Sequence, residues 1–433
     1  MTPAARLAAA IEIIGSIEQD RVPAADALKE WGRAHRFAGS GDRAGIAGLV
    51  YDALRRKASS TFLMDAATPR AILLGMLRRE RALSTEAIAA LADGSRHAPE
   101  PLRDDERRRL DHETIAQAPA WVAGDYPEWL DPQMRASFGD ERVAEGAALA
   151  SRAPLDLRVN TLKATRTEAQ AALADLAPVP TPWSPDGLRI VLSPDARSPG
   201  IHAEAAFIKG MVEVQDEGSQ LAALFAGAQP GEQVLDLCAG AGGKTLALAA
   251  AMQNKGQLYA TDSDKRRLAP IYERIERAGA RNVQVIAPRR DGGELAALAG
   301  RCDLVVIDAP CSGTGAWRRN PDAKWRMRPG ALEQRLRQQA EVLDRAAAAL
   351  KPGGRIAYIT CSVLAAENGA QVAAFLTRQP GFRVVLPELV IGALGEAAPA
   401  FQAAALVDAQ GLLMTPRRTG TDGFFVSVLR HQG

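Results

Sequence analysis

From about residue 212 onward, the sequence repeats one pattern of short apolar segment, loop and helix. The apolar segments "EQVLDL", "GQLYATD", "NVQVI", "CDLVVIDAP" and "GGRIAYITCS" are rich in Val, Ile and Leu, as buried parallel strands are. Helical spacing fills the intervals between them. This alternation predicts a doubly wound α/β sheet of the Rossmann-like kind, which binds its ligands at the carboxyl ends of the strands.

The first strand is followed by a glycine-rich turn, "CAGAGGKT". A phosphate-binding P-loop needs glycine five positions before Gly243, and that position is Cys238. Gly240, Gly242 and Gly243 still allow the backbone to approach a ligand closely at a helix N-terminus. Asp262 ends the next strand, twenty residues past Gly242, where an acid can bind ribose hydroxyls. We therefore predict an adenosine-containing cofactor, either a dinucleotide or S-adenosylmethionine.

Two cysteines follow predicted strands at the same edge of the sheet: Cys311 in "DAPCSGTG" and Cys361 in "TCSVLAAENG". A single cysteine there is best interpreted as a small buried hydrophobe with an inert thiol. Two in equivalent places, one of them close to Asp308, favour chemistry. Carbon 5 of a pyrimidine accepts a methyl group once a thiolate has added at carbon 6. In that reaction the carboxyl of Asp308 shares a proton with N3, and a second thiol assists release.

The rest of the chain divides into two further regions. Residues 1–135 show helical spacing of Ile, Leu and Val throughout, and "SRHAPEPLRDDERRRLD" within them is expected to be an exposed tether. Residues 145–210 mix short strands and helices in a small α+β module, and residues 211–433 form the sheet domain. A chain of 433 residues, 47% hydrophobic and 24% charged, is long enough for such domains.

Composition limits the cellular location and the kinds of site that we expect for the protein. The N-terminus carries Glu12 and Glu18 within helical spacing, so we interpret it as a helix and not as a signal peptide. No apolar run reaches the roughly 18 residues of a membrane helix. The four cysteines form no Cys-x-x-Cys pair, which predicts free thiols and no metal site. We expect a cytoplasmic monomer without a membrane partner.

The net charge is only +2, so any contact with nucleic acid must come from local patches. One basic run with two tryptophans follows Cys311 and contains Arg318, Arg319, Lys324 and Trp325. Such a run is usually a solvated face, but next to a catalytic loop we interpret it as an RNA contact. Arg158 and Lys163 would extend that surface. A second basic group, in the helical region, fits helix C-termini and RNA contact equally well: Arg55, Arg56, Lys57, Arg78, Arg79 and Arg81.

Taken together, the motifs resemble one known family. "DLCAGAGGKT", "DAPCSGTG" with "RRNPDAKW", "YITCSV" and the tail "GTDGFFVSVLR" are similar to the Sun (Fmu) family of bacterial RNA cytosine-C5 methyltransferases. "LRVNTLK" and "VQDEGSQL" resemble its pre-catalytic segments. The helical region, with "GDRAGIAGLVYDALRRK", resembles the NusB-type RNA-binding domain of the ribosomal RNA methyltransferase B branch. The resemblance covers nearly the whole chain and implies S-adenosylmethionine as cofactor.

The resemblance also implies roles for individual residues. Cys361 matches the nucleophile, Cys311 the cysteine that assists release, and Asp308 the motif carboxylate near cofactor and cytosine. Lys244 either positions the substrate or Asp308, or balances charge near the loop. Asp262 matches the ribose-binding acid. The cofactor loop comprises Cys238, Ala239, Gly240, Ala241, Gly242, Gly243 and Lys244.

Two positions depart from the family pattern. Ala241 stands where the family usually has proline, which should loosen the turn slightly. The acid expected near adenine falls on Arg289 by ungapped counting from Gly279, and a two-residue insertion makes Asp291 the match. We predict Asp291.

Several functions remain open on the sequence alone. The resemblance favours cytosine C5 in 16S ribosomal RNA as the target. The same chemistry on transfer RNA is the first alternative, and a non-catalytic RNA-binding ribosome assembly factor is the second. A metabolic dehydrogenase would leave both cysteines and the basic run unexplained.

Overall fold

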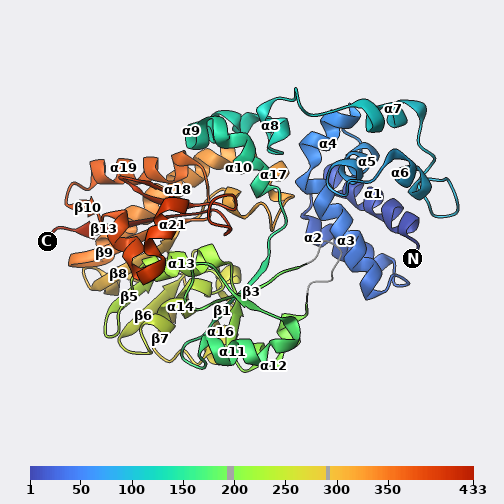
Figure 1. The fold of residues 1–433 in the computed structure, drawn as a ribbon. Helices are drawn as coiled ribbons and strands as arrows, with labels where there is room; N and C mark the ends of the chain where they lie inside the picture. The colour runs from blue at the N-terminus through green and yellow to red at the C-terminus, as the bar shows by residue number, and fades with distance from the viewer. Residues whose placement is uncertain (193–198, 289–292) are drawn as a thin grey trace. The chain divides into compact units, whose positions relative to one another are not determined.

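The computed structural model describes residues 1–192, 199–288 and 293–433. These residues form two compact units. One combines Met1–Arg152 with Trp317–Met327, and the other combines Ala153–Leu192, Pro199–Ala316 and Arg328–Gly433. The first is called the helical unit below and the second the sheet unit (Figure 1).

The described residues up to Leu149 form helices and no strand, as the apolar spacing predicts. Thr2 caps the first helix by accepting a hydrogen bond from the Ala5 amide, and Pro3 occupies its first turn. Apolar side chains such as Ile13, Leu54 and Leu73 pack into one core. The α-helices are α1 (Pro3–Asp20), α2 (Ala24–Ala34), α3 (Ser40–Arg55), α4 (Lys57–Met64), α5 (Pro69–Arg79), α6 (Thr85–Leu91), α7 (Asp104–His112), α8 (Ala120–Ala123), α9 (Asp131–Phe138) and α10 (Arg142–Leu149).

The stretch expected to be an exposed tether is part of this bundle instead. Its second half forms α7, and Leu102 and Leu110 are buried in the same core as α1 and α5. Arg70 also donates to Glu106 of α7 at 2.9 Å. The prediction was wrong because the charged residues dominate the composition of the stretch, while two leucines eight positions apart are enough to anchor it.

The small α+β module folds around a four-stranded sheet. Its strands are β1 (Leu155–Val159), β2 (Val179–Pro180), β3 (Gly187–Ile190) and β4 (Val212–Val214), in the order β2-β3-β1-β4 with antiparallel pairing. Helices α11 (Arg166–Ala172) and α12 (Ala205–Ile208) belong to the same module. Since β4 ends at Val214, the module reaches slightly beyond residue 210.

The sheet domain is built on five parallel strands: β5 (Gln233–Asp236), β6 (Gln257–Thr261), β7 (Val283–Ile286), β8 (Cys302–Asp308) and β9 (Leu350–Thr360). Antiparallel strands complete it: β10 (Phe382–Val384), β11 (Leu406–Asp408), β12 (Gly411–Met414) and β13 (Phe424–His431). The order is β11-β12-β13-β9-β8-β5-β6-β7. The chain runs outward from β5 and then returns to β8 on the other side of β5, which creates a topological switch point.

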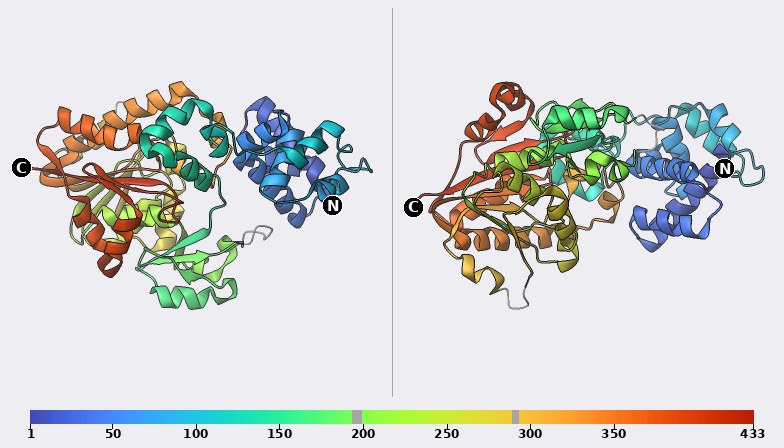
Figure 2. Two further views of the ribbon diagram at one scale, coloured as in Figure 1. Left: turned by 45° about the horizontal axis from the view of Figure 1, so that its top comes forward. Right: turned by 90° about the horizontal axis from the view of Figure 1, so that it is seen from below.

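Helices cover both faces of this sheet (Figures 1 and 2). Val234 and Leu304 face one layer, with α13 (Glu217–Phe225), α14 (Gly243–Ala251), α20 (Pro387–Ile391) and α21 (Ala398–Ala404). Leu235 and Val305 face the other, with α18 (Pro329–Ala349) and α19 (Gly369–Arg378). Consecutive strand residues thus enter opposite cores, as a doubly wound sheet requires. The predicted α/β architecture is confirmed.

Candidate active site

The glycine-rich turn joins β5 to α14 and needs two of its glycines. Gly240 and Gly242 adopt φ of 51° and 86°, in the left-handed region that favours glycine. A Cβ on Gly242 would also lie 2.5 Å from Cγ1 of Ile271. The turn therefore passes without side chains at these two positions into the N-terminus of α14, at the carboxyl end of β5.

Asp262 lies directly after β6 and holds this turn in place. One carboxylate oxygen accepts a hydrogen bond from the Gly240 amide at 2.9 Å, and the other accepts from the Asp264 amide at 2.9 Å. The side chain is buried. The acid predicted from its spacing thus lies against the predicted cofactor loop.

An arginine that the sequence analysis did not single out supports the turn from outside. Arg274 donates to the carbonyl of Ala241 at 2.8 Å and to the carboxylate of Glu213 at 3.0 Å. Ala241 is the position that departs from the family's proline, so a side chain from α16 (Ile271–Ala278) supplies a constraint there. No sequence pattern marks this contact, because Arg274 resembles any other basic residue on an amphipathic helix.

Two groups at the base of the turn have pKa values that burial raises. Burial raises the pKa of Asp236 to about 7, while its oxygen accepts from the Thr245 hydroxyl at 2.7 Å. Burial also raises the pKa of the Cys238 thiol, with the carboxylates of Asp236, Asp262 and Asp308 adding to the effect. Cys238 is therefore a protonated, unreactive thiol at neutral pH.

Lys244 lies in the first turn of α14 and reaches across to the end of β8. Its ammonium lies 2.7 Å from a carboxylate oxygen of Asp308 and 3.3 Å from the Ser219 hydroxyl. Lys244 is buried, whereas the side chain of Asp308 keeps 36% of its surface exposed. Of the interpretations left open for Lys244, the geometry favours the one in which it positions Asp308.

The two cysteines after β8 and β9 meet at the same edge. The sulfur atoms of Cys311 and Cys361 lie 3.4 Å apart. The hydrogen bond to Cys361 raises the pKa of Cys311 well above its usual value, and burial adds to that shift. Because each cysteine follows a parallel strand, the sequence predicts that the two residues share one edge of the sheet. The sulfur–sulfur contact is visible only in three dimensions.

The basic run after Cys311 differs from the prediction. Lys324 of α17 (Ala323–Arg326) is buried, and its ammonium donates to the carbonyls of Arg55 and Asp125 at 2.9 and 2.6 Å. The Trp325 indole donates to the Leu54 carbonyl at 2.7 Å. Because Lys324 is buried and satisfied by these carbonyls, the prediction that it contacts RNA is wrong for this structure. Trp325 is only partly buried, so its contact with RNA stays a prediction.

The other residues that were predicted to contact RNA differ in how far their side chains are exposed to solvent. Arg318 is buried, and so is Arg158, whose guanidinium donates to Gln215 at 2.7 Å. Burial lowers the pKa of Arg158 to about 10. Neither side chain offers its charge to a phosphate in this structure, which corrects both predictions. Arg319 is half-buried and Lys163 is exposed, so these two stay predictions. Asp291, predicted near adenine, lies outside the described residues.

Several residues of the second basic group are engaged in ion pairs. Arg56 contacts Glu80 at 2.7 Å, Lys57 contacts Glu18 at 2.5 Å, and Arg81 contacts Asp52 at 2.8 Å. These pairs tie helices to one another within the unit. A structural role therefore explains these three residues without RNA.

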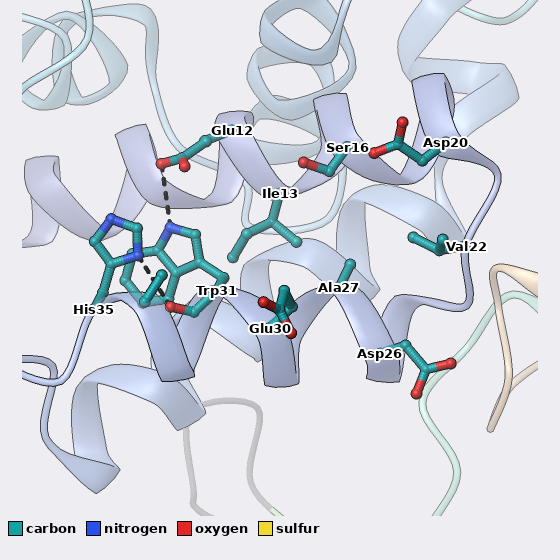
Figure 3. Close-up of a pocket in the computed structure, with 11 residues that line it drawn as sticks. Glu12, Ile13, Ser16, Asp20, Val22, Asp26, Ala27, Glu30, Trp31 and His35 are labelled. Carbon is teal, nitrogen blue, oxygen red and sulfur yellow. Dashed lines mark hydrogen bonds between the residues drawn. The ribbon is translucent and has the colours of Figure 1, made fainter.

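A cavity of about 400 Å³ between α1 and α2 of the helical unit has acidic walls (Figure 3). Its lining includes Glu12, which accepts from the Trp31 indole at 3.1 Å, and His35, which stacks on that ring. Asp20, Asp26 and Glu30 line it as well. Such a surface repels phosphate groups, so it does not extend a nucleic-acid contact.

Within residues 1–192, 199–288 and 293–433, no helix is long and apolar enough to cross a membrane. The same described residues contain no group of three or more His, Cys, Asp and Glu side chains able to hold a metal ion.

Two family models match the sequence. Residues 223–430 match "16S rRNA methyltransferase RsmB/F", and residues 126–195 match the ferredoxin-like domain of RsmF/B-like methyltransferases. The first match contains both cysteines, Asp308 and the glycine-rich turn. The second contains β1 to β3 of the small module.

Curated relatives agree with these matches over part of their length. The chain is 37% identical over 259 residues to ribosomal RNA small subunit methyltransferase B of Citrobacter koseri, covering 59% of this chain and 58% of that protein. It is 37% identical over 261 residues to the protein of the same name from Salmonella typhi, with the same coverage. The match thus spans less than two thirds of the relatives' length.

Solved structures share the fold at low sequence identity. The crystal structure of PH0851 superposes with a TM-score of 0.71 at 24% identity, over 99% of both chains. NSun6 from Pyrococcus horikoshii with SFG gives a TM-score of 0.59 at 22% identity, over 71% of this chain and 98% of that one. Over residues 126–195 and 223–430 the chain is therefore similar to the RsmB/F methyltransferase family.

Proposed function

We propose that the protein transfers a methyl group from S-adenosylmethionine to carbon 5 of a cytosine in RNA. The observation that carries this proposal is the contact between the Cys311 and Cys361 thiols, 3.4 Å apart, at strand ends next to Asp308. A pyrimidine carbon needs a nucleophile, a proton partner and a group that assists release, and these three side chains supply them.

The turn between β5 and α14 fits the proposed cofactor. Gly240 and Gly242 bring bare backbone to the helix N-terminus, and Asp262 lies beside it to bind ribose hydroxyls. NSun6 was crystallised with SFG, an analogue of this cofactor. When bound, S-adenosylmethionine supplies an electrophilic methyl group on a sulfonium. We also keep Asp291 as the proposed adenine-side acid.

The side chains divide the proposed reaction between them. Cys361 adds through its sulfur to carbon 6 of the cytosine, which makes carbon 5 nucleophilic. Asp308, held by Lys244, faces N3 and shares the proton there. After carbon 5 is methylated, its proton passes to water, the electron pair of that C–H bond re-forms the double bond between carbons 5 and 6, and the bond to carbon 6 breaks with Cys361 leaving as a thiolate. Cys311 assists this step from its neighbouring position. The pKa of Cys311 is raised by its hydrogen bond to Cys361, and this favours Cys361 as the nucleophile.

The proposed substrate is 16S ribosomal RNA. The matching family model is named for 16S rRNA methyltransferases, and the curated relatives are named as ribosomal RNA small subunit methyltransferases. Transfer RNA is the alternative target. The cytosine must leave its stack to reach Cys361, so unpaired RNA is expected. We further propose that the helical unit is a NusB-like RNA-binding domain, that Lys163 and Arg319 contact phosphates, and that the protein works as a cytoplasmic monomer.

A denaturing gel tests the proposal. Wild type, Cys311→Ala and Cys361→Ala are each mixed with unmodified small-subunit rRNA and S-adenosylmethionine carrying a labelled methyl group. We expect a protein–RNA band that survives denaturation only for Cys311→Ala, because its adduct forms but is not released. Cys302→Ala serves as the control, since this buried thiol lies at the start of β8, away from the strand ends.

Two outcomes would contradict parts of the proposal. A trapped band with Cys361→Ala would exchange the roles of the two thiols. If no variant traps RNA and wild type transfers no label, the protein acts on another substrate or binds RNA without catalysis. Repeating the assay with transfer RNA separates those two cases.

A further inference from the structure

A buried glutamate lies beneath the two cysteines. Glu367 ends the short 3₁₀ helix Ala365–Glu367, six residues after Cys361, and has no exposed surface. Its carboxylate accepts a hydrogen bond from the Ser312 amide at 2.8 Å and from the Ser312 and Ser362 hydroxyls, each at 2.5 Å. The first of these serines follows Cys311 and the second follows Cys361.

The carboxylate therefore connects the two cysteine turns to each other. A third segment joins them, since the Gln339 amide of α18 donates both to Glu367 at 3.0 Å and to the Pro310 carbonyl at 2.9 Å. The Tyr358 hydroxyl of β9 donates to the backbone carbonyl of Glu367 at 2.7 Å. Residues from α18 and both turns thus converge on the Glu367 side chain, and Tyr358 of β9 holds its backbone.

A buried carboxylate is costly unless several donors satisfy it. Here the donors come from neutral groups, so the cost is met by hydrogen bonds whose positions are fixed on both turns. Moving either turn by even one ångström would break a short hydrogen bond to a buried charge. The hydrogen bonds therefore resist movement of either cysteine turn, both toward the other turn and away from it.

We infer that Glu367 is a positioning residue that sets the separation of the Cys311 and Cys361 thiols. The separation is a property of the fold, whereas its use in releasing methylated RNA rests on the proposed function. Glu367 touches neither thiol in this arrangement and acts through Ser312 and Ser362.

A trivalent arsenical measures the thiol separation without RNA. Phenylarsine oxide reacts with two thiols, forming two As–S bonds and releasing its oxygen as water with the two thiol protons. It is retained tightly only where both sulfurs reach the same arsenic atom. We expect wild type to bind one equivalent by intact mass spectrometry, and both Cys311→Ala and Cys361→Ala to lose tight retention.

The test compares variants of Glu367 in the full chain. Glu367→Ala and Glu367→Asp should weaken retention on the order of a hundredfold, because the second thiol loses its high effective concentration. Glu367→Gln should stay close to wild type, since its carbonyl can accept from Ser312 and Gln339 while its amide donates to the serine hydroxyls. Glu367→Asp keeps the charge and serves if the alanine variant fails to fold.

A matched control separates positioning from general destabilisation. Glu217 of α13 is also fully buried and accepts from the Trp183 and Ser184 amides at 2.6 and 2.8 Å, in contacts that do not involve the cysteine turns. Glu217→Ala should lower thermal stability and leave arsenical retention unchanged. Wild-type retention in Glu367→Asp, or an equal loss in Glu217→Ala, would overturn the inference.

A second arm uses RNA. Glu367→Ala, with both cysteines present, should accumulate the denaturation-resistant band, because Cys311 is no longer in place to assist release. If wild type transfers no methyl group while the arsenical results are as expected, the proposed function fails and the inference on thiol separation stands. If wild type is active and Glu367→Ala retains the arsenical, the inference fails alone.

Discussion

At the scale of single residues, chemically identical side chains differ in pKa and reactivity because their neighbours differ. Burial raises the pKa of Cys238, with nearby carboxylates adding to the effect, whereas the pKa of Cys311 is raised by its hydrogen bond to Cys361, 3.4 Å away, and by burial. Sequence spacing could place all three near the same edge of the sheet. It could not assign them roles, because a thiol's reactivity depends on partners that the fold brings from distant positions.

Asp236 leads to a prediction about pH and stability. Its pKa is about 7 in the folded protein and near 4 when unfolded, so the folded state holds an extra proton between those values. Stability should therefore fall as pH rises from about 4 to about 7, by on the order of a few kcal/mol. Asp236→Asn should flatten this dependence, as measured by urea unfolding at pH 5 and 8.

The control for this prediction is Asp140, whose side chain is fully exposed. Asp140→Asn should leave the pH dependence as in wild type. Parallel curves for Asp236→Asn and wild type would show that the buried carboxyl does not hold the extra proton.

Gly242 gives a second prediction at this scale. Alanine there would adopt a left-handed backbone, at a cost of about 1 kcal/mol, and would press its Cβ against Ile271 at 2.5 Å. We expect Gly242→Ala to weaken binding of S-adenosylmethionine by about tenfold or more, measured by calorimetry. Gly330→Ala is the control, because its Cβ would meet no atom within 4 Å. Unchanged affinity in Gly242→Ala would count against the proposed cofactor loop.

At the scale of elements, local sequence patterns predicted the strands. Whether a polar side chain is buried or exposed depended on contacts between segments that are distant in the sequence. The strands that carry Asp308 and Cys361 are runs of Val and Ile readable over a few residues. Lys324 belongs to a basic run that looks the same whether it faces water or buried carbonyls. Its partner Arg55 is 269 residues away in the sequence, so no local pattern reveals the contact.

The burial of Lys324 predicts how its removal affects the protein. Lys324→Ala leaves the carbonyls of Arg55 and Asp125 without their donor and should lower the melting temperature. It should not change the salt dependence of RNA binding. Lys163→Ala should do the reverse, reducing the salt slope by about one unit without affecting stability. A reduced salt slope in Lys324→Ala would restore the original prediction of a phosphate contact.

At the scale of the whole molecule, the sequence predicted the order of the regions but not the composition of the helical unit. Composition changes along the chain mark boundaries only between consecutive segments. The unit instead recruits Trp317–Met327 from a point far beyond its last helix, α10. Trp317 is 2% exposed, so this strip contributes to the interior as well as to the hydrogen bonds of Lys324 and Trp325.

A fragment experiment follows from this composition. Residues 1–152 expressed alone should melt at a lower temperature than the helical unit does within the full chain, because the strip is missing. A synthetic peptide of residues 317–327 should raise the melting temperature of that fragment in a concentration-dependent way. A peptide with alanine at Lys324 and Trp325 is the control. No shift with the native peptide would mean that the strip adds little to the unit.

The divided helical unit also restricts how such a chain can change over generations. A recombination event that exchanged residues 1–152 for another helical domain would leave Trp317–Met327 behind, facing a surface it does not fit. A substitution in α3 that moves the carbonyl of Leu54 or Arg55 would therefore also disturb Trp325 or Lys324 of the strip. The region after Cys311 is thus held under two selective pressures at once, one from the catalytic turn before it and one from a helix inherited hundreds of residues upstream.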